Sequence, residues 1–210
     1  MTVSSIPVPP SLAGSLPLIA GSIALDFANT QSGLGTTSHL NHLRAPEHVA
    51  AWIEHAGGLS KEDTARLCDE LSPAQAAALY ERAIALRSAI YEVGVAIAAG
   101  SAPSEAALAT LSSLHAAFLE RAEFAAGKDR CFWRWSVAAA PVEAALGPIG
   151  LAAVELFTHG DFSRIKQCGG HACGWLFYDA TKNKGRRWCE MEVCGNRAKQ
   201  KRLQARRRSA

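Results

Sequence analysis

Apolar positions recur every three or four residues over much of the first 160 residues, which is the period of an amphipathic helix. The two longest stripes predict a helix from Ser72 to about Gly100 and a second from about Ser104 to Ala126. Ser72 and Gln75 form a capping box around a proline, which is a common start of a helix. We therefore expect these two helices to pack together as the centre of a mainly α-helical, orthogonal domain.

Shorter patterns predict the remaining elements of this region. A helix is expected from Pro46 to Ala56, another begins near Ser60, and a third runs from Pro148 to Thr158. The segment from Cys131 to Val137 favours a short strand or a buried extended segment, and residues 1–20 read as an irregular lead-in. We expect core positions for the isolated cysteines and for three tryptophans, namely Cys68, Cys131, Trp52, Trp133 and Trp135.

Charge divides the chain near residue 160. Residues 1–160 hold 9 Lys and Arg against 15 Asp and Glu, a net charge of −6, whereas residues 161–210 hold 13 against 4, a net charge of +9. This break predicts a helical domain over 21–160 and a small module over 161–208 that ends in a basic helix. Only the second part has the charge to attract a polyanion.

Four of the six cysteines form two pairs of identical spacing in the basic part. Cys168 and Cys173 flank four residues, and so do Cys189 and Cys194. Two matched pairs can bring four thiolates to one tetrahedral zinc ion, which predicts a single structural Zn²⁺. His171 lies inside the first loop, where we expect it to face solvent. Because four protein ligands leave no open position on the metal, the pattern argues against metal catalysis.

The residues around these cysteines predict how the module folds. Aromatic and aliphatic runs at 162–166 and 175–178 flank the first pair, as a small β-hairpin requires. Cys194 and Asn196 should open a helix that continues into the basic tail. The expected fold class is therefore mainly α, with a small zinc-binding module made of a β-hairpin and a helix.

These motifs resemble a known family. The strings CGNRAK at 194–199, RRWCEMEVC at 186–194 and CGWLFYDATKNKG at 173–185 resemble the CGNR zinc finger. Upstream, GSIALDFANT at 21–30 and LRAPEHVAAWI at 43–53 resemble the helical ABATE domain that precedes this finger in bacterial proteins. The resemblance implies a stress-responsive, DNA-binding transcription regulator with zinc held by the four cysteines.

Nucleic acid is the partner that the basic module favours, and double-stranded DNA is the first expectation. Asn196 and Arg197 are placed to contact bases, or alternatively to brace the zinc loop. RNA binding is a variant if Trp175, Phe177 and Tyr178 are exposed for stacking. A protein-interaction module and a solvated run of charge are the remaining alternatives. The candidate nucleic-acid-binding residues are Lys182, Lys184, Arg186, Arg187, Asn196, Arg197, Lys199, Lys201 and Arg202.

One polar cluster stands out in the helical part, made of Asp26, Asn29 and Thr30. It predicts helix capping or a buried hydrogen-bond network, with a ligand site as the alternative. The sequence holds no phosphate loop, nucleophile elbow or H-E-x-x-H string, so we do not expect an enzyme. The weaker enzymatic hypothesis combines Asp26 with a histidine, taken from His39, His42 and His115.

Location and assembly follow from composition. We find no signal peptide and no apolar run of membrane-spanning length, and clustered thiols are typical of a reducing compartment. We therefore expect a cytoplasmic protein without a membrane partner. One short finger has a small footprint on DNA, so a homodimer formed through the helical domain is a further hypothesis.

Overall fold

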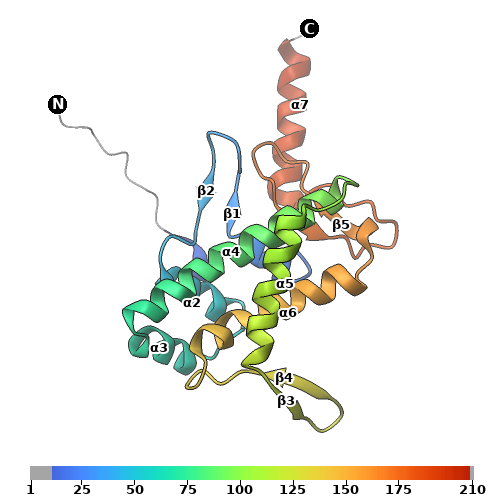
Figure 1. Ribbon diagram of the computed structural model, residues 1–210. Helices are drawn as coiled ribbons and strands as arrows, with labels where there is room; N and C mark the ends of the chain where they lie inside the picture. Colours follow the sequence, from blue (N-terminus) through green and yellow to red (C-terminus); the bar gives the residue numbers. More distant parts are fainter. Residues whose placement is uncertain (1–10, 209–210) are drawn as a thin grey trace, which may run out of the picture.

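The computed structural model describes residues 11–208. Its regular structure within these residues consists mainly of helices, with three small antiparallel sheets of two strands each (Figure 1). The helices are α1 (Ile23–Ala28), α2 (Pro46–His55), α3 (Lys61–Glu70), α4 (Pro73–Ala98), α5 (Glu105–Glu120), α6 (Pro141–His159) and α7 (Asn196–Arg208). The strands are β1 (Gln31–Ser32) with β2 (Leu40–Asn41), β3 (Glu123–Ala126) with β4 (Cys131–Arg134), and β5 (Ile165–Gln167) with β6 (Leu176–Tyr178).

This architecture confirms the predicted fold class, a mainly α protein with a hairpin-and-helix module at its C-terminal end. The predicted lead-in falls partly on residues 1–10, which lie outside the described residues. Within 11–20 the backbone is largely irregular apart from a short 3₁₀ turn at Ala13–Ser15. Ala13 and Leu16 are nevertheless buried, because this turn packs against α2.

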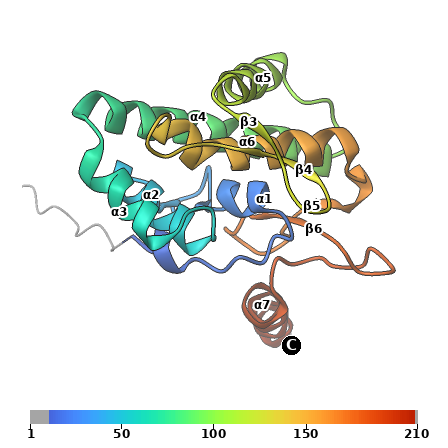
Figure 2. The ribbon, with the colours of Figure 1, turned by 90° about the horizontal axis from the view of Figure 1, so that it is seen from below.

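The core lies where α4, α5 and α6 pack against one another and where α1 packs on α4 and α6 (Figures 1 and 2). Its largest buried side chains include Leu86 and Ile90 of α4, Phe118 of α5 and Leu146 of α6. The predicted helix pair is therefore the centre of the fold. Helices α3 and α4 begin where the sequence signals predict, since the Ser60 hydroxyl caps α3 and the Ser72 and Gln75 capping box forms at α4.

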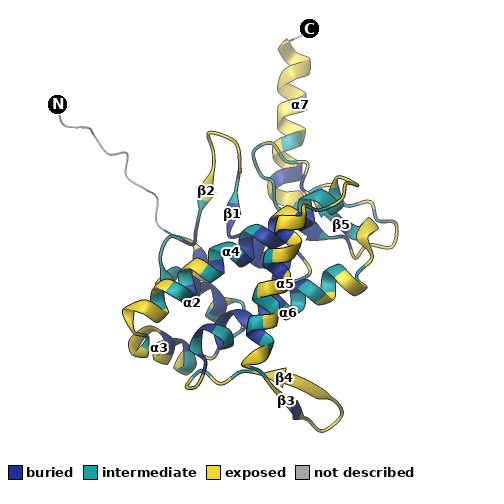
Figure 3. Ribbon diagram, viewed as in Figure 1, coloured by how far each residue is buried: buried dark blue, intermediate teal, exposed yellow. Residues whose placement is uncertain are grey.

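The end of α5 differs from the prediction. The helix stops at Glu120, and Glu123–Ala126 form β3, which pairs with β4 in an exposed ribbon (Figure 3). Cross-strand contacts favour the ribbon, because Phe124 packs on Trp133 with ring centroids 4.8 Å apart. The predicted strand at Cys131 is confirmed.

Burial was predicted wrongly at several positions on or near exposed surfaces. Trp133 and Cys131 are exposed because the ribbon projects from the body, and Cys68 lies on the exposed side of α3. Trp135 is half-buried and donates its indole N–H to the carbonyl of Phe118. Trp52 alone of the three tryptophans is fully buried, as expected.

Helix α6 begins at Pro141 rather than at Pro148, so Pro148 lies within the helix. Val142, Leu146 and Ile149 form one buried face that continues past it, and their burial outweighs the backbone hydrogen bond that a proline cannot donate. By length and composition alone α6 is long and apolar enough to span a membrane, whereas the sequence predicted no run of that length. It packs against α1, α4 and α5, as a core helix does.

The C-terminal module packs directly against this core. Strands β5 and β6 pack on α4, and β6 also packs on α1. Leu176 and Phe177 of β6 belong to the same buried cluster as Leu86 and Ile90 of α4. At Gly94 the contact is so close that an added Cβ would lie 2.6 Å from Leu176 Cδ1. Within this module, α7 projects away from the body as an exposed rod (Figures 1 and 3).

Candidate metal centre

The four predicted ligands converge on one point. Cys168 follows β5, Cys173 precedes β6, Cys189 follows a long loop, and Cys194 lies in the turn that opens α7. Their sulfur atoms all lie within 4.8 Å of one another. The Sγ atoms of Cys173 and Cys194 are each 3.7 Å from that of Cys189.

These distances fit one tetrahedral zinc ion. Zn–S bonds of about 2.3 Å place two thiolates of a tetrahedron about 3.8 Å apart. A disulfide requires a sulfur separation of about 2.05 Å, so none of the four is cross-linked. The cluster therefore matches a closed site with four thiolates, in which the metal holds the module together and offers no position for substrate.

The first cysteine loop is shaped around the sulfur of Cys168. The backbone N–H groups of Gly170 and Cys189 donate to it at 3.4 and 3.3 Å. Hydrogen bonds from the neighbouring Cys173 and Cys189 thiols, together with these N–H groups, hold the pKa of Cys168 well below its usual range. Such donors favour a thiolate, which is the form that binds metal.

Gly170 is required at this loop by space. A Cβ at this position would lie 3.0 Å from Cys194 Sγ and 3.3 Å from Cys168 Sγ. His171 beside it is exposed, as predicted. The sequence Gly-Gly-His therefore allows the loop to pass close to two sulfur atoms.

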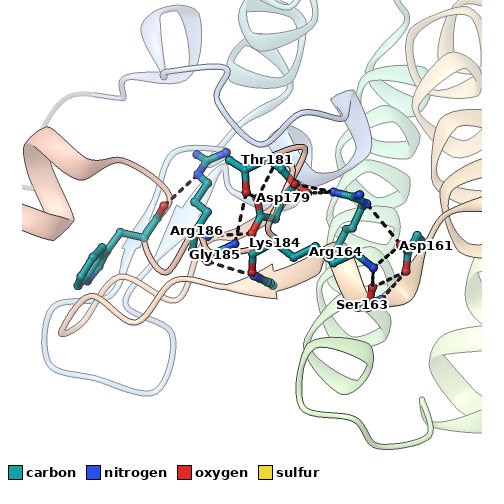
Figure 4. Close-up of polar contacts among 10 residues, drawn as sticks. Asp161, Ser163, Arg164, Asp179, Thr181, Lys184, Gly185 and Arg186 are labelled. Atoms are coloured by element: carbon teal, nitrogen blue, oxygen red, sulfur yellow. Dashed lines mark hydrogen bonds and ion pairs between the residues drawn. The ribbon is translucent and has the colours of Figure 1, made fainter.

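The loop between β6 and the second cysteine pair is built around Asp179 (Figure 4). This carboxylate is fully buried and accepts hydrogen bonds from Lys166 Nζ at 2.7 Å, from Thr181 and from the backbone N–H of Arg186 at 2.9 Å. Burial alone would raise its pKa, but these donors outweigh burial and hold the pKa well below its usual range.

Two predicted nucleic-acid contacts lie within this loop and are already engaged. Arg186 places its guanidinium 4.4 Å from the ring centre of Phe177 and donates to the carbonyls of Ile19, Trp188 and Cys189. Lys184 pairs with Asp161 at 2.8 Å and also donates to Ser163. Because their polar atoms bind protein groups, Arg186 and Lys184 stabilise this loop, and these contacts disfavour a role in nucleic-acid binding.

Two loops carry the metal ligands, at 168–173 and 179–194, and we call them the metal loops. A groove of about 460 Å³ lies between these loops and α7. The predicted residues Arg187, Arg197, Lys201 and Arg202 line it, together with Gly169, His171, Trp188 and Ala198. Lys199 and Lys182 are exposed outside this lining. Asn196 donates from Nδ2 to the carbonyl of Glu192 at 2.9 Å, which is the bracing role considered for it.

Comparison with protein families agrees with this geometry. The ABATE model, described as "Putative stress-induced transcription regulator", matches residues 21–160, well over half of the chain. The chain belongs to the ABATE family. The CGNR zinc finger model matches residues 164–207, which hold all four thiols, so the cofactor is one zinc ion. No curated protein matches the chain.

The polar cluster of the ABATE domain turns out to support the CGNR finger. Asn29 is 2% exposed, donates from Nδ2 to the carbonyl of Leu176 and accepts from the N–H of the same residue, both at 2.8 Å. Asp26 accepts from the N–H of Ala20, and Thr30 donates to the carbonyl of Phe27. All three are buried and internally bonded, as expected of the hydrogen-bond network rather than of a ligand site.

Further contacts join the ABATE domain to the CGNR finger. Tyr91 of α4 donates to the carbonyl of Gly174, and Trp175 donates to the carbonyl of Gln31. The N–H of Gly33 donates to the carbonyl of Cys173, a metal ligand, at 2.8 Å. Burial of Phe177 and the bonded indole of Trp175 leave these aromatics engaged with the protein.

Sequence reasoning did not assign roles to Asp179 and Lys166. The sequence did hold a signal for Asp179, since Asp-x-Thr is typical of a turn in which the aspartate accepts a hydrogen bond from the residue two positions later. The N–H of Thr181 donates to Asp179 in this way. Tyr91 carried no such signal, because its role depends on the carbonyl of Gly174, 83 residues away.

Proposed function

We propose that this protein is a DNA-binding transcription regulator that binds double-stranded DNA through the cations lining the groove between the metal loops and α7. The observation that carries the proposal is the convergence of Arg187, Arg197, Lys201 and Arg202 on that groove. Among the described residues none of these four cations forms an ion pair with an acid, and all four are exposed. Clustered exposed cations on a rigid base are what phosphate binding requires.

The geometry suggests how the groove is used. Arg187 belongs to the metal loop, whereas Arg197, Lys201 and Arg202 belong to the first half of α7. A helix that projects from the body can enter the major groove of DNA while its flanking cations contact the two backbones. Arg197 is the groove residue nearest the start of the helix, where base contacts are usual in such motifs, and its fork matches a guanine edge.

The alternatives receive less support. RNA recognition by stacking on Trp175, Phe177 and Tyr178 is disfavoured because Phe177 is fully buried, Tyr178 is half-buried and the Trp175 indole donates a hydrogen bond to the Gln31 carbonyl. The aromatic ring of Trp188 lines the groove, and its centre lies 5.3 Å from the Arg187 guanidinium carbon. A four-thiolate site has no open position, and we propose a regulatory role without catalysis in the bacterial cytoplasm.

Binding of the full chain to a fluorescent DNA duplex tests this proposal. The groove variant carries Arg197→Gln, Lys201→Gln and Arg202→Gln. The control variant loses the same charge far from the groove, through Arg66→Gln, Lys128→Gln and Arg130→Gln. We expect the groove variant to bind at least about tenfold more weakly and the control to bind nearly as well as the wild type.

Equal losses in the two variants would mean that only net charge matters and would overturn the groove as the site. Absence of binding by the zinc-loaded wild type would overturn the function. Tighter binding to single-stranded RNA than to the duplex, measured in competition, would favour the RNA alternative instead.

A further inference from the structure

Arg87 is a buried cation in the ABATE domain that the finger and its proposed function do not use. It lies on α4, on the face that also carries Tyr80 and Tyr91, and only 5% of it is exposed. Its Nη1 donates to Asn41 Oδ1 at 2.6 Å, and its Nε is buried without a hydrogen-bond partner. A guanidinium carries five N–H donors in a planar fork, so the single hydrogen bond to Asn41 uses only a small part of its capacity.

No carboxylate compensates this charge. The ion pairs among residues 11–208 involve other cations, and Arg87 forms none of them. Burial lowers its pKa, yet an arginine remains charged in a protein. A buried unpaired cation costs stability, and replacing such groups with apolar side chains is often neutral or stabilising. The chain thus keeps a group that its own fold does not satisfy.

We propose that Arg87 anchors a binding site for a small ligand that carries an oxyanion, a carboxylate or a phosphate group. The planar fork of Arg87 matches two oxygens of either group. Asn41 indicates where a ligand reaches Arg87, because Asn41 is half-exposed whereas Arg87, which donates to it, is buried. The oxyanion replaces Asn41 Oδ1 as the acceptor of Arg87.

The position of this site connects it to the finger. Asn41 lies in β2, whose pairing with β1 involves only two residues in each strand. The β1 side of this small hairpin is hydrogen-bonded to the residues around the first metal loop. The N–H of Gly33 donates to the carbonyl of Cys173, and the indole of Trp175 donates to the carbonyl of Gln31. A ligand that displaces Asn41 therefore acts on the hairpin that supports a zinc ligand.

Arginine side-chain NMR on the full zinc-loaded chain tests this site directly. The ¹⁵Nε–H signal of Arg87 is followed while phosphate, or separately acetate, replaces chloride through the millimolar range at constant ionic strength. We expect a saturable shift of this signal. Arg82 is the control on the same helix, because its guanidinium is already paired with Glu143 at 2.7 Å, and its signal should not move.

A response to both anions identifies a general oxyanion site, and a response to one of them identifies its class. If neither anion shifts the Arg87 signal, the proposal is wrong. Because this measurement involves no DNA, its result is independent of whether the groove binds nucleic acid.

Thermal unfolding of Arg87→Met separates binding from structure. In chloride we expect a melting temperature equal to or above that of the wild type, and no gain when phosphate is added. Arg82→Met should keep the wild-type gain with phosphate. If Arg87→Met instead melts well below the wild type in chloride and the wild type gains nothing from either anion, Arg87 is a structural tie to Asn41 and the site is refuted.

Discussion

Asn29 joins the ABATE domain to the zinc finger through a single side chain. Its amide pairs with both the N–H and the carbonyl of Leu176, in the strand that follows the metal ligand Cys173. An aspartate could accept but not donate here, and an alanine could do neither. The side chain thus fixes the register between α1 and β6 as a backbone strand would.

Replacing Asn29 with alanine should therefore affect both parts of the molecule. Two buried backbone groups lose their partners, so we expect a loss of roughly 2–4 kcal/mol in the free energy of unfolding. Urea unfolding and zinc competition with a chelator measure stability and metal affinity. The control is Asn183→Ala, which removes the same type of side chain from an exposed position in the metal loop. Unchanged zinc affinity in Asn29→Ala would show that the two parts are not coupled here.

Asp179 is the second residue on which the metal loop depends. Asp179→Asn leaves Lys166 without its ion pair, and we expect a loss of about 2 kcal/mol. Replacing the exposed Asp161 with asparagine should cost less, because water screens its charge. The folded-state pKa of Asp179 is lowered. Its contribution is therefore complete above the unfolded pKa of about 3.9 and is lost as the pH falls below it.

Denaturation of wild type and Asp179→Asn at several pH values checks this prediction. Acid also releases zinc from thiolates, so the quantity to compare is the difference in stability between the two proteins. That difference should shrink below pH ~4. A difference that stays constant into strong acid would show that the charge of Asp179 is not what stabilises the loop.

At the scale of elements, α7 differs from every other helix. No residue of α7 is buried, and seven of its thirteen residues are Lys or Arg with no acid among them. Like charges four residues apart, such as Arg197 with Lys201, destabilise a helix that has no packing partner. Phosphates that neutralise these charges should therefore stabilise it.

Hydrogen exchange of the α7 amides checks this expectation. In the free chain we expect rapid exchange beyond Lys201 and slower exchange near Asn196, where the metal turn anchors the helix. Duplex DNA should slow exchange along the helix, and the α5 amides serve as an internal control. Full protection of α7 without DNA, or no change when DNA is added, would contradict this account.

Sequence patterns predicted elements wherever local signals decide the outcome. The capping box at Ser72 and the apolar stripe that follows gave α4 its correct start and end. The matched cysteine spacing gave the metal site, because the spacing itself is the chemical requirement. Cross-strand packing of Phe124 on Trp133 overrode the helical period at the end of α5, and no local signal announces such a partner.

The candidate site was likewise predictable in part. Arg187, Arg197, Lys201 and Arg202 lie together because they flank the metal ligands Cys189 and Cys194 in sequence. Arg186 differs from its neighbour Arg187 only in direction, and the sequence cannot show that it turns toward Phe177 and the buried carbonyls. The joining role of Asn29 depends on a contact across 147 residues.

For the molecule as a whole, the shared core implies that metal binding stabilises more than the finger. Removing zinc should lower the melting temperature of the helical signal, in a transition that includes the ABATE helices, because β6 packs on α1 and α4. Circular dichroism at 222 nm with and without chelator measures it, and added zinc should restore the signal. A melting curve of the helices that does not change with zinc would show an independent finger.

The central claim is that the groove between the metal loops and α7 binds DNA through its cations. The most direct measurement is the binding constant of the full zinc-loaded chain for a DNA duplex as a function of salt. Each neutralised phosphate contributes a slope of about −0.9 in log K against log salt, so four groove cations predict a slope of about −3 to −4. The groove variant lacks three of these cations, so its slope should be smaller in magnitude by roughly 2 to 3. A slope near zero, or the same slope in the groove variant and the wild type, would contradict the claim.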